Sequence, residues 1–290
     1  TQSGLSIVEW KPVTGIMPPL NNADWINEFE KYQQYPEYKM LNNDMSLKEF
    51  KVIYFWEYLH RLLGRLIGII FIIPFVYFIF KGLSKTLTKK LLILLILGAL
   101  QGYIGWYMVK SGLVNVPHVS HLRLSIHLML AIIIIAYSFW ISLIIPNFSK
   151  VKTIKKSNLL YLSYLILFLI AIQSTFGAFV AGLNAGYQWN TFPLINGVLI
   201  PKDLISMSPF WDNLIYNKMT VQFIHRLLGT ILLSFTIYLK YKSYHQEILD
   251  EQKYCINLLL ICIISQYLLG VITLVLYVPI GLGVLHQIGA

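Results

Sequence analysis

Four histidines occupy matched positions in the two halves of this chain. His60 and His225 each begin the same stretch, His-Arg-Leu-Leu-Gly. His127 and His286 follow them at similar distances along the chain, and each stands near the start of an apolar run. An ionisable group inside lipid costs roughly 2.5–3.5 kcal/mol on insertion scales, so such a residue usually serves a function. The pattern predicts two buried metal or cofactor sites, one at His60 and His127 and one at His225 and His286.

The residue types narrow the kind of group that these sites could hold. Zinc would need three or four ligands, typically with cysteine or carboxylate, and the sequence has no such cluster. A di-iron carboxylate site needs Glu-x-x-His twice, but the counterpart of Glu57 in the second half is Gln222. Bis-histidine haem fits best, with one imidazole from each of two helices. The sequence lacks Cys-x-x-Cys-His, which excludes covalently attached c-type haem.

Three neighbouring side chains extend the two predicted sites. Arg61 and Arg226 each follow a predicted ligand directly, so we expect them to pair with haem propionates, with snorkelling to the membrane surface as the alternative. Glu57 precedes His60 by one helical turn, which places both on one helix face. A carboxylate at the first site only suggests that this site performs chemistry and the second stores or passes electrons. Glu57 could activate a water molecule there, or lie exposed at the interface.

The composition indicates which elements must position these residues. Of the 290 residues, 57% are hydrophobic and 12% charged, with a mean hydropathy of +0.63, which excludes a soluble globular protein. Apolar runs near 20 residues can cross the roughly 30 Å hydrocarbon layer as helices. The sequence therefore predicts an all-α polytopic membrane protein. We expect spans at about 56–80, 89–109, 122–146, 158–182, 219–241 and 254–278, and a seventh that opens near 280.

The distribution of charge predicts how the spans are oriented. A net charge of +10 in a soluble domain would suggest nucleic acid, but here lysines concentrate in the short loops 81–90 and 147–157. By the positive-inside rule these loops, together with 240–253, face the cytoplasm or matrix. We therefore expect no nucleic-acid partner. With alternating spans, all four histidines lie near the outer leaflet.

The two halves also resemble each other outside the histidines. Residues 3–6 resemble 181–184, and residues 97–105 have a fainter counterpart in 265–273. A repeat of four helices explains this, with the first helix expected before residue 1 and the last continuing beyond 290. Two four-helix bundles related by a pseudo-twofold axis along the membrane normal are the expected arrangement. We expect residues 1–150 to hold the first site and residues 151–290 the second.

Other residues receive structural interpretations. Gly64-x-x-x-Gly68 permits close helix approach or leaves room for a flat macrocycle. His121, in the loop before a span, is expected on the solvent side. Cys255 and Cys262, the only cysteines, lie within one span and are expected to be small packing residues of the core.

Many stretches of the chain resemble the haem A synthase family, membrane enzymes of cytochrome oxidase assembly. The resemblance rests on residues 3–6, 10–12, 18–19, 56–65, 101–113, 123–128, 177–186, 190–194, 225–226 and 285–287. Some members carry a cysteine pair in an outer loop, and this chain has none there, so no disulfide role is carried over.

The resemblance implies eight helices in two four-helix halves. It implies oxidation of the C8 methyl group of haem O to a formyl group by successive hydroxylations, which gives haem A. His60 and His127 would flank the substrate haem, with Glu57 beside it. His225 and His286 would ligate a haem b cofactor.

The resemblance also implies partners and a location. These are the haem O synthase that supplies the substrate, a membrane electron acceptor, a second copy of the chain as a candidate, and the bacterial inner membrane, or the mitochondrial inner membrane in a eukaryote. The residues themselves leave two alternatives: a di-haem cytochrome b-like electron carrier, and a transporter with structural histidines.

Overall fold

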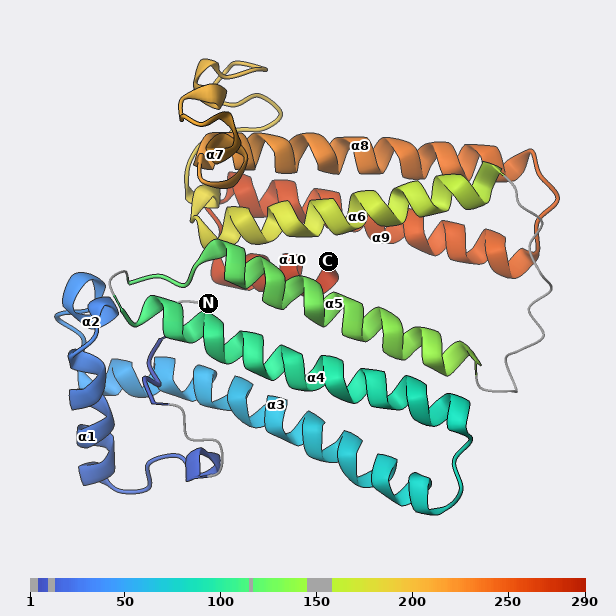
Figure 1. Ribbon diagram of the computed structural model, residues 1–290. Coiled ribbons are helices and arrows are strands. Elements are labelled where there is room, and N and C mark those ends of the chain that lie inside the picture. Colours follow the sequence, from blue (N-terminus) through green and yellow to red (C-terminus); the bar gives the residue numbers. More distant parts are fainter. Residues whose placement is uncertain (1–4, 10–13, 115–116, 145–157) are drawn as a thin grey trace. The chain divides into compact units, whose positions relative to one another are not determined.

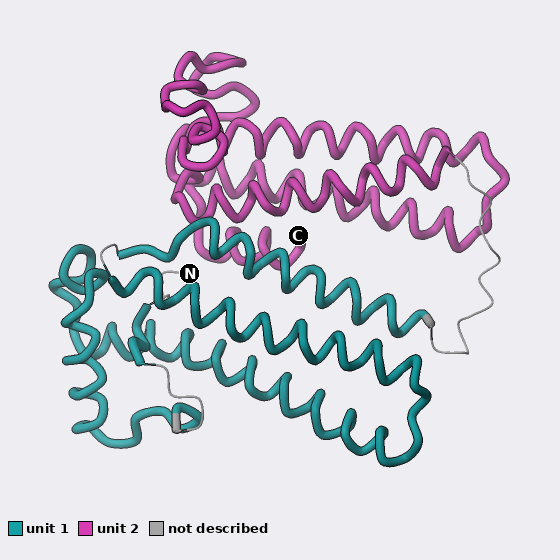
Figure 2. Tube along the Cα trace, in the orientation of Figure 1, with its two compact units in different colours: residues 1–150 teal, residues 151–290 magenta. Residues whose placement is uncertain are grey.

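The structure, a computed structural model, describes residues 5–9, 14–114, 117–144 and 158–290. The chain divides into two compact units, residues 1–150 and 151–290 (Figure 2). Within the described residues, six helices are long and apolar enough to cross a membrane (Figure 1). The prediction of an all-α polytopic membrane protein is confirmed. The relation of the two units by a pseudo-twofold axis stays a prediction.

The first unit holds three of the long helices, with α4 packed between α3 and α5 (Figure 1). Short helices precede them at the N-terminal side. The elements are η1 (Thr14–Ile16), α1 (Asn22–Gln33), α2 (Pro36–Leu41), α3 (Leu47–Phe80), α4 (Lys85–Gly112) and α5 (His121–Ile144).

Helix α3 begins at Leu47, earlier than the predicted span at 56. Ser46 and Glu49 form a capping box, in which the Ser46 backbone N–H donates to Glu49 Oε2 at 2.8 Å and the Ser46 hydroxyl accepts from the Glu49 N–H. The first turns are amphipathic because Phe50 and Tyr54 are buried while their neighbours are polar or exposed. Hydropathy alone therefore places the start of this helix too late.

An aromatic cluster fixes the N-terminal helices to the first turns of α3. Tyr32 of α1 and Phe50 of α3 are fully buried and stack with 5.3 Å between ring centroids. Trp25 meets Tyr54 edge to face at 5.0 Å, and Ile7 joins the same cluster. Offset and edge-to-face pairs contribute about 0.5–1.5 kcal/mol each beyond the area they bury. The cluster therefore holds the segment around residue 7 beside α3.

The second unit repeats the use of long helices. Its elements are α6 (Asn158–Gly182), η2 (Ala185–Tyr187), η3 (Lys202–Ile205), α7 (Phe210–Ile215), α8 (Lys218–Tyr244), α9 (Asp250–Val275) and α10 (Ile280–Gly289). Helices α6 and α8 form its tightest pair, with a buried core of Leu159, Ile166, Leu232 and Leu239.

Two asparagines organise the long loop between α6 and α8. Asn217 caps α8, since its Oδ1 accepts from the Met219 N–H at 3.0 Å, and its Nδ2 donates to the Asp203 carbonyl at 3.0 Å. Asn213 is fully buried and accepts from the Ser206 N–H at 2.9 Å. The loop is thereby fixed to the start of α8, the helix that carries His-Arg-Leu-Leu-Gly in this unit.

Two interpretations of single residues are wrong, and a third is narrowed to one of its alternatives. His121 is buried at the start of α5, not placed toward solvent. Cys255 and Cys262 are exposed on α9, because a lipid-facing position is as apolar as a core position and the sequence does not separate the two. A Cβ at Gly64 or Gly68 would meet no atom of the described residues within 4 Å, so close helix approach finds no support there, and room for a macrocycle stays a prediction.

Some expectations fall outside the described residues. These are the lysine-rich loop 147–157, the end of the third span at 145–146, residues 3–4 and the whole stretch 10–12.

Candidate functional site

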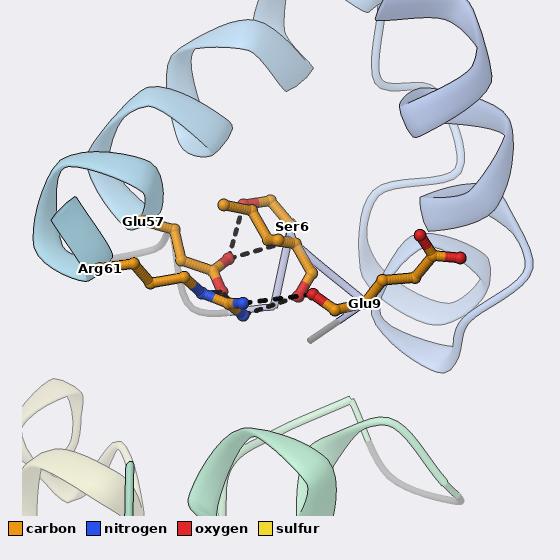
Figure 3. Close-up of polar contacts among 5 residues, drawn as sticks. Ser6, Glu9, Glu57 and Arg61 are labelled. Atoms are coloured by element: carbon orange, nitrogen blue, oxygen red, sulfur yellow. Dashed lines mark hydrogen bonds and ion pairs between the residues drawn. The ribbon is translucent and has the colours of Figure 1, made fainter. Parts of the chain in front are cut away.

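Glu57 is buried near the start of α3, where it binds the N-terminal segment (Figure 3). Its Oε2 accepts hydrogen bonds from the Ser6 hydroxyl at 2.7 Å and from the Ile7 N–H at 2.9 Å. Its Oε1 accepts from Arg61 Nη2 at 2.6 Å and from Nε at 3.1 Å, across one turn of the helix. Both carboxylate oxygens are therefore engaged, and the predicted alternative of an exposed Glu57 does not describe its position.

Arg61 ties the same segment from the other side. Its Nη2 donates to the Ile7 carbonyl at 2.8 Å and its Nη1 to the Glu9 carbonyl at 3.3 Å. The side chains of Arg61 and Glu57 are 13% and 7% exposed, so the ion pair lies largely out of water. Removing one partner of such a pair costs about 3–5 kcal/mol, since the other charge is left uncompensated. Arg61 thus holds the loop in place, and its pairing with a propionate stays a prediction.

The second unit builds a matching network around Gln222. Its Nε2 donates to the Ala185 carbonyl at 3.0 Å and to the Gln188 carbonyl at 2.7 Å. Its Oε1 accepts from Arg226 Nη2 at 3.0 Å, and Arg226 Nη1 donates to the Thr191 carbonyl at 2.7 Å. In both units the residue three positions before the histidine and the arginine after it bind a segment that lies earlier in the chain, separated from the long helix by short helices.

The polarity of the two networks differs. The Glu57 carboxylate can only accept, and it receives donors from Ser6 and Ile7. The Gln222 amide group donates to two carbonyls instead. The first unit therefore carries a buried ion pair where the second carries a neutral amide.

The histidines of the second unit lie close together. The ring centroids of His225 and His286 are 6.5 Å apart, with the ring planes at 84°. Two imidazoles that bind one metal through bonds of about 2 Å each have ring centres roughly 6 Å apart. The Nδ1 of each ring is buried, and each ring interacts with a backbone group, of Gln173 for His225 and of Gln266 for His286. Both observations fit a pair of axial ligands to a haem iron.

The histidines of the first unit also come together. His127 on α5 is half-buried, and His60 on α3 lies close enough to interact with it electrostatically. The His127 Nδ1 is likewise buried with no partner among the described residues, whereas the His60 ring is exposed. The structure thus groups Glu57, Arg61 and both histidines in the first unit.

The repeated stretches contain residues that contact the histidines, but no sequence pattern assigned them this role. A Cβ at Gly105 would lie 3.0 Å from His127 Cε1, and Gln101 Nε2 donates to the His127 carbonyl at 3.1 Å. Gln266 makes the equivalent bond to the His286 carbonyl. The available signal was a spacing, Gln-x-x-x-Gly, which occurs at 101–105, 173–177 and 266–270.

Comparison with known proteins gives the family. Residues 1–290 match the family described as cytochrome oxidase assembly protein. A haem A synthase of Wolbachia pipientis wMel is 47% identical over 292 residues, which cover 99% of this chain and 81% of that protein. The haem A synthases of Nitrosospira multiformis and Ehrlichia canis are 46% and 44% identical, and the matches cover 100% of this chain and 82% of each. No solved structure matches. The chain belongs to the cytochrome oxidase assembly protein family.

Proposed function

We propose that this protein is a haem A synthase, a membrane oxidoreductase that converts haem O to haem A by oxidising the C8 methyl group to a formyl group. Family membership over the whole chain and the names of its relatives support this function. The structural observation that carries the proposal is the 6.5 Å separation of His225 and His286, which suits two ligands of one haem iron.

His225 and His286 would hold haem b in the second unit. Their rings lie on α8 and α10, and each is oriented by a backbone group, of Gln173 for His225 and of Gln266 for His286. When bound, this haem supplies a site that accepts and passes on single electrons. Arg226 fixes the loop next to this site through the carbonyl of Thr191, and we assign it to the surroundings of the propionates.

His60 and His127 would flank the substrate, haem O, in the first unit. Glu57 lies one helical turn from His60 and has its charge balanced by Arg61. We assign Glu57 the role of a general base toward water at the edge of the substrate. Its two oxygens accept four hydrogen bonds, which fix the carboxylate and use all of its lone pairs, so water must replace one of these donors before Glu57 can act as a base.

The difference between the units supports a division of labour. The carboxylate of Glu57 stands only in the first unit, and its counterpart Gln222 cannot act as a base. We therefore place the oxidation of the methyl group in residues 1–150 and the transfer of electrons in residues 151–290.

The protein is a multi-pass membrane protein, since six of its helices can cross the bilayer. We place it in the bacterial inner membrane, or the mitochondrial inner membrane in a eukaryote, with both sites toward the outer leaflet. The lysines of residues 81–90, between the end of α3 and the first turns of α4, support this orientation. Its partners would be the haem O synthase that provides the substrate, a membrane electron acceptor and, as a candidate, a second copy of the chain.

A pigment analysis tests the function. The protein is expressed in a host that makes haem O but no haem A, and the extracted haems are separated and identified by mass. Haem A should appear only in cells that contain the protein. A purified protein with bound haem but with no haem A in the cells would instead support the di-haem electron carrier. A protein without haem absorbance would support the transporter.

A further inference from the structure

Three of the four predicted ligand rings lie against a glycine of a neighbouring helix. A Cβ built on Gly105 would lie 3.0 Å from His127 Cε1, and one on Gly177 would lie 3.1 Å from His225 Cε1. A Cβ on Gly270 would lie 2.8 Å from His286 Cε1. The same ring atom meets a glycine in each case, on three different pairs of helices.

A larger residue at any of these positions would press on the ring, most of all at Gly270. Separations of 2.8–3.1 Å are shorter than ordinary van der Waals contact, so a methyl group at any of these positions would move the ring or the helix. In contrast, a Cβ on Gly281, on the same helix as His286, would meet nothing within 4 Å. Close contact is therefore a property of particular glycines and not of all glycines in the spans.

A glutamine stands four residues before each of these glycines. Gln101 Nε2 donates to the backbone carbonyl of His127 at 3.1 Å, and Gln266 Nε2 donates to that of His286. These bonds fix the helix segment that carries the ring, while the glycine fixes the ring itself. The groups that orient a metal ligand often matter nearly as much as the ligand.

We propose that Gly105, Gly177 and Gly270 each form a seat, a glycine surface against which the ring of a haem-binding histidine packs. Gln101 and Gln266 hold the backbone of the ligand residues. They are positioning residues, since they act on haem through the histidines. The inference rests on the proposed function, because it assumes that the seated rings bind haem.

The Gly270→Ala variant tests the seat at His286, and Gly281→Ala is its matched control. The added methyl group should turn the ring away from the iron and lower the haem affinity by about 10–100-fold. The low-spin electron paramagnetic resonance signal of the purified protein should weaken or shift its g-values, while Gly281→Ala keeps the wild-type haem content and signal. A Gly270→Ala protein with unchanged haem content and g-values overturns the seat. Absence of low-spin haem from the wild type overturns the proposed function and the seat together.

A double-mutant cycle on the haem-free protein covers the case in which Gly270→Ala folds but is too unstable to keep its haem. The midpoint of thermal unfolding is measured for Gly270→Ala, His286→Ala and the double variant. If the methyl group clashes with the imidazole, Gly270→Ala should lower the midpoint in the wild type but not in the His286→Ala background, where alanine is the better helix former. Equal losses in both backgrounds contradict the seat, because the methyl group would then disturb something other than the ring.

Discussion

Glu57 and Gln222 use opposite chemistry to hold equivalent loops. The carboxylate accepts from Ser6 and Ile7, and the amide donates to backbone carbonyls. An amide at position 57 would remove the negative charge that balances the largely buried Arg61. The two side chains are nearly isosteric, so their exchange tests charge with little change in volume.

The Glu57→Gln substitution should destabilise the protein by about 3 kcal/mol, because Arg61 would remain as a buried charge without its carboxylate. Haem A formation should fall as well, since the proposed base is lost. Thermal unfolding and pigment analysis measure the two effects. Glu30→Gln, the same change at an exposed residue of α1, is the control and should leave both unchanged. A Glu57→Gln protein of wild-type stability would contradict the account of the ion pair.

Glu37, which lies outside the membrane spans, should make the stability of the protein depend on pH. It is 8% exposed on α2, its Oε2 has no hydrogen-bond partner among the described residues, and burial, with the charge of Glu57, raises its pKa to about 7. The folded protein therefore binds a proton that the unfolded chain releases near the ordinary pKa of 4.5. The contribution of Glu37 to stability is full below that value and is lost as the pH rises through about 7.

The Glu37→Gln variant removes this titration. It should unfold at a higher temperature than the wild type at about pH 8, where the buried carboxylate costs up to roughly 3 kcal/mol, and at a similar temperature at about pH 4.5. Thermal unfolding at both pH values measures the difference. The same shift in midpoint at both pH values would show that Glu37 acts through packing and not through its proton.

At the scale of helices and loops, the residues that cap α4 and α8 differ in what they hold. Ser84 caps α4 with a single contact to the Leu87 N–H, whereas Asn217 caps α8 and also binds the preceding loop. The start of α8 thus depends on residues far from it in the sequence, and the start of α4 does not.

Asn217→Ala should therefore cost more than Ser84→Ala. Loss of a cap costs about 0.5–2 kcal/mol, which is the expected range for Ser84→Ala. Asn217→Ala should exceed it, because it also leaves the carbonyl of Asp203 and the hydroxyl of Ser206 without this donor. Thermal unfolding of the two variants measures the difference, and equal losses would mean that the loop does not depend on Asn217.

The sequence predicts the membrane-spanning helices, but it does not predict the contacts between the loops and these helices. Long apolar runs predict membrane helices because every backbone group in lipid needs a partner within the helix. The start of α3 was missed because its first turns pack on α1 and are polar on the other side. The bonds from Ser6 and Ile7 to Glu57 join residues about 50 positions apart, and no local pattern encodes them. The spacing of Gln and Gly was visible, but only the structure shows which face meets a ring.

At the scale of the whole molecule, the proposed division of labour predicts different losses in the two units. His286→Ala should remove the resident haem, since that ring is a proposed ligand of haem b. His127→Ala should keep the resident haem and still fail to make haem A. Haem content of the purified protein and pigment analysis of the cells measure the two effects separately. If His127→Ala loses the resident haem and His286→Ala keeps it, the resident haem lies in the first unit, and the roles proposed for the two units are reversed.

The opposite polarity of the two networks also limits what genetic exchange between the halves can produce. Both helices carry His-Arg-Leu-Leu-Gly, a stretch at which one half could recombine with the other. A hybrid that joined the loop of residues 185–191 to α3 would turn the carbonyls of Ala185 and Gln188 toward the carboxylate of Glu57, where acceptor would face acceptor. The two networks, although each joins a loop to a long helix, would therefore not interchange.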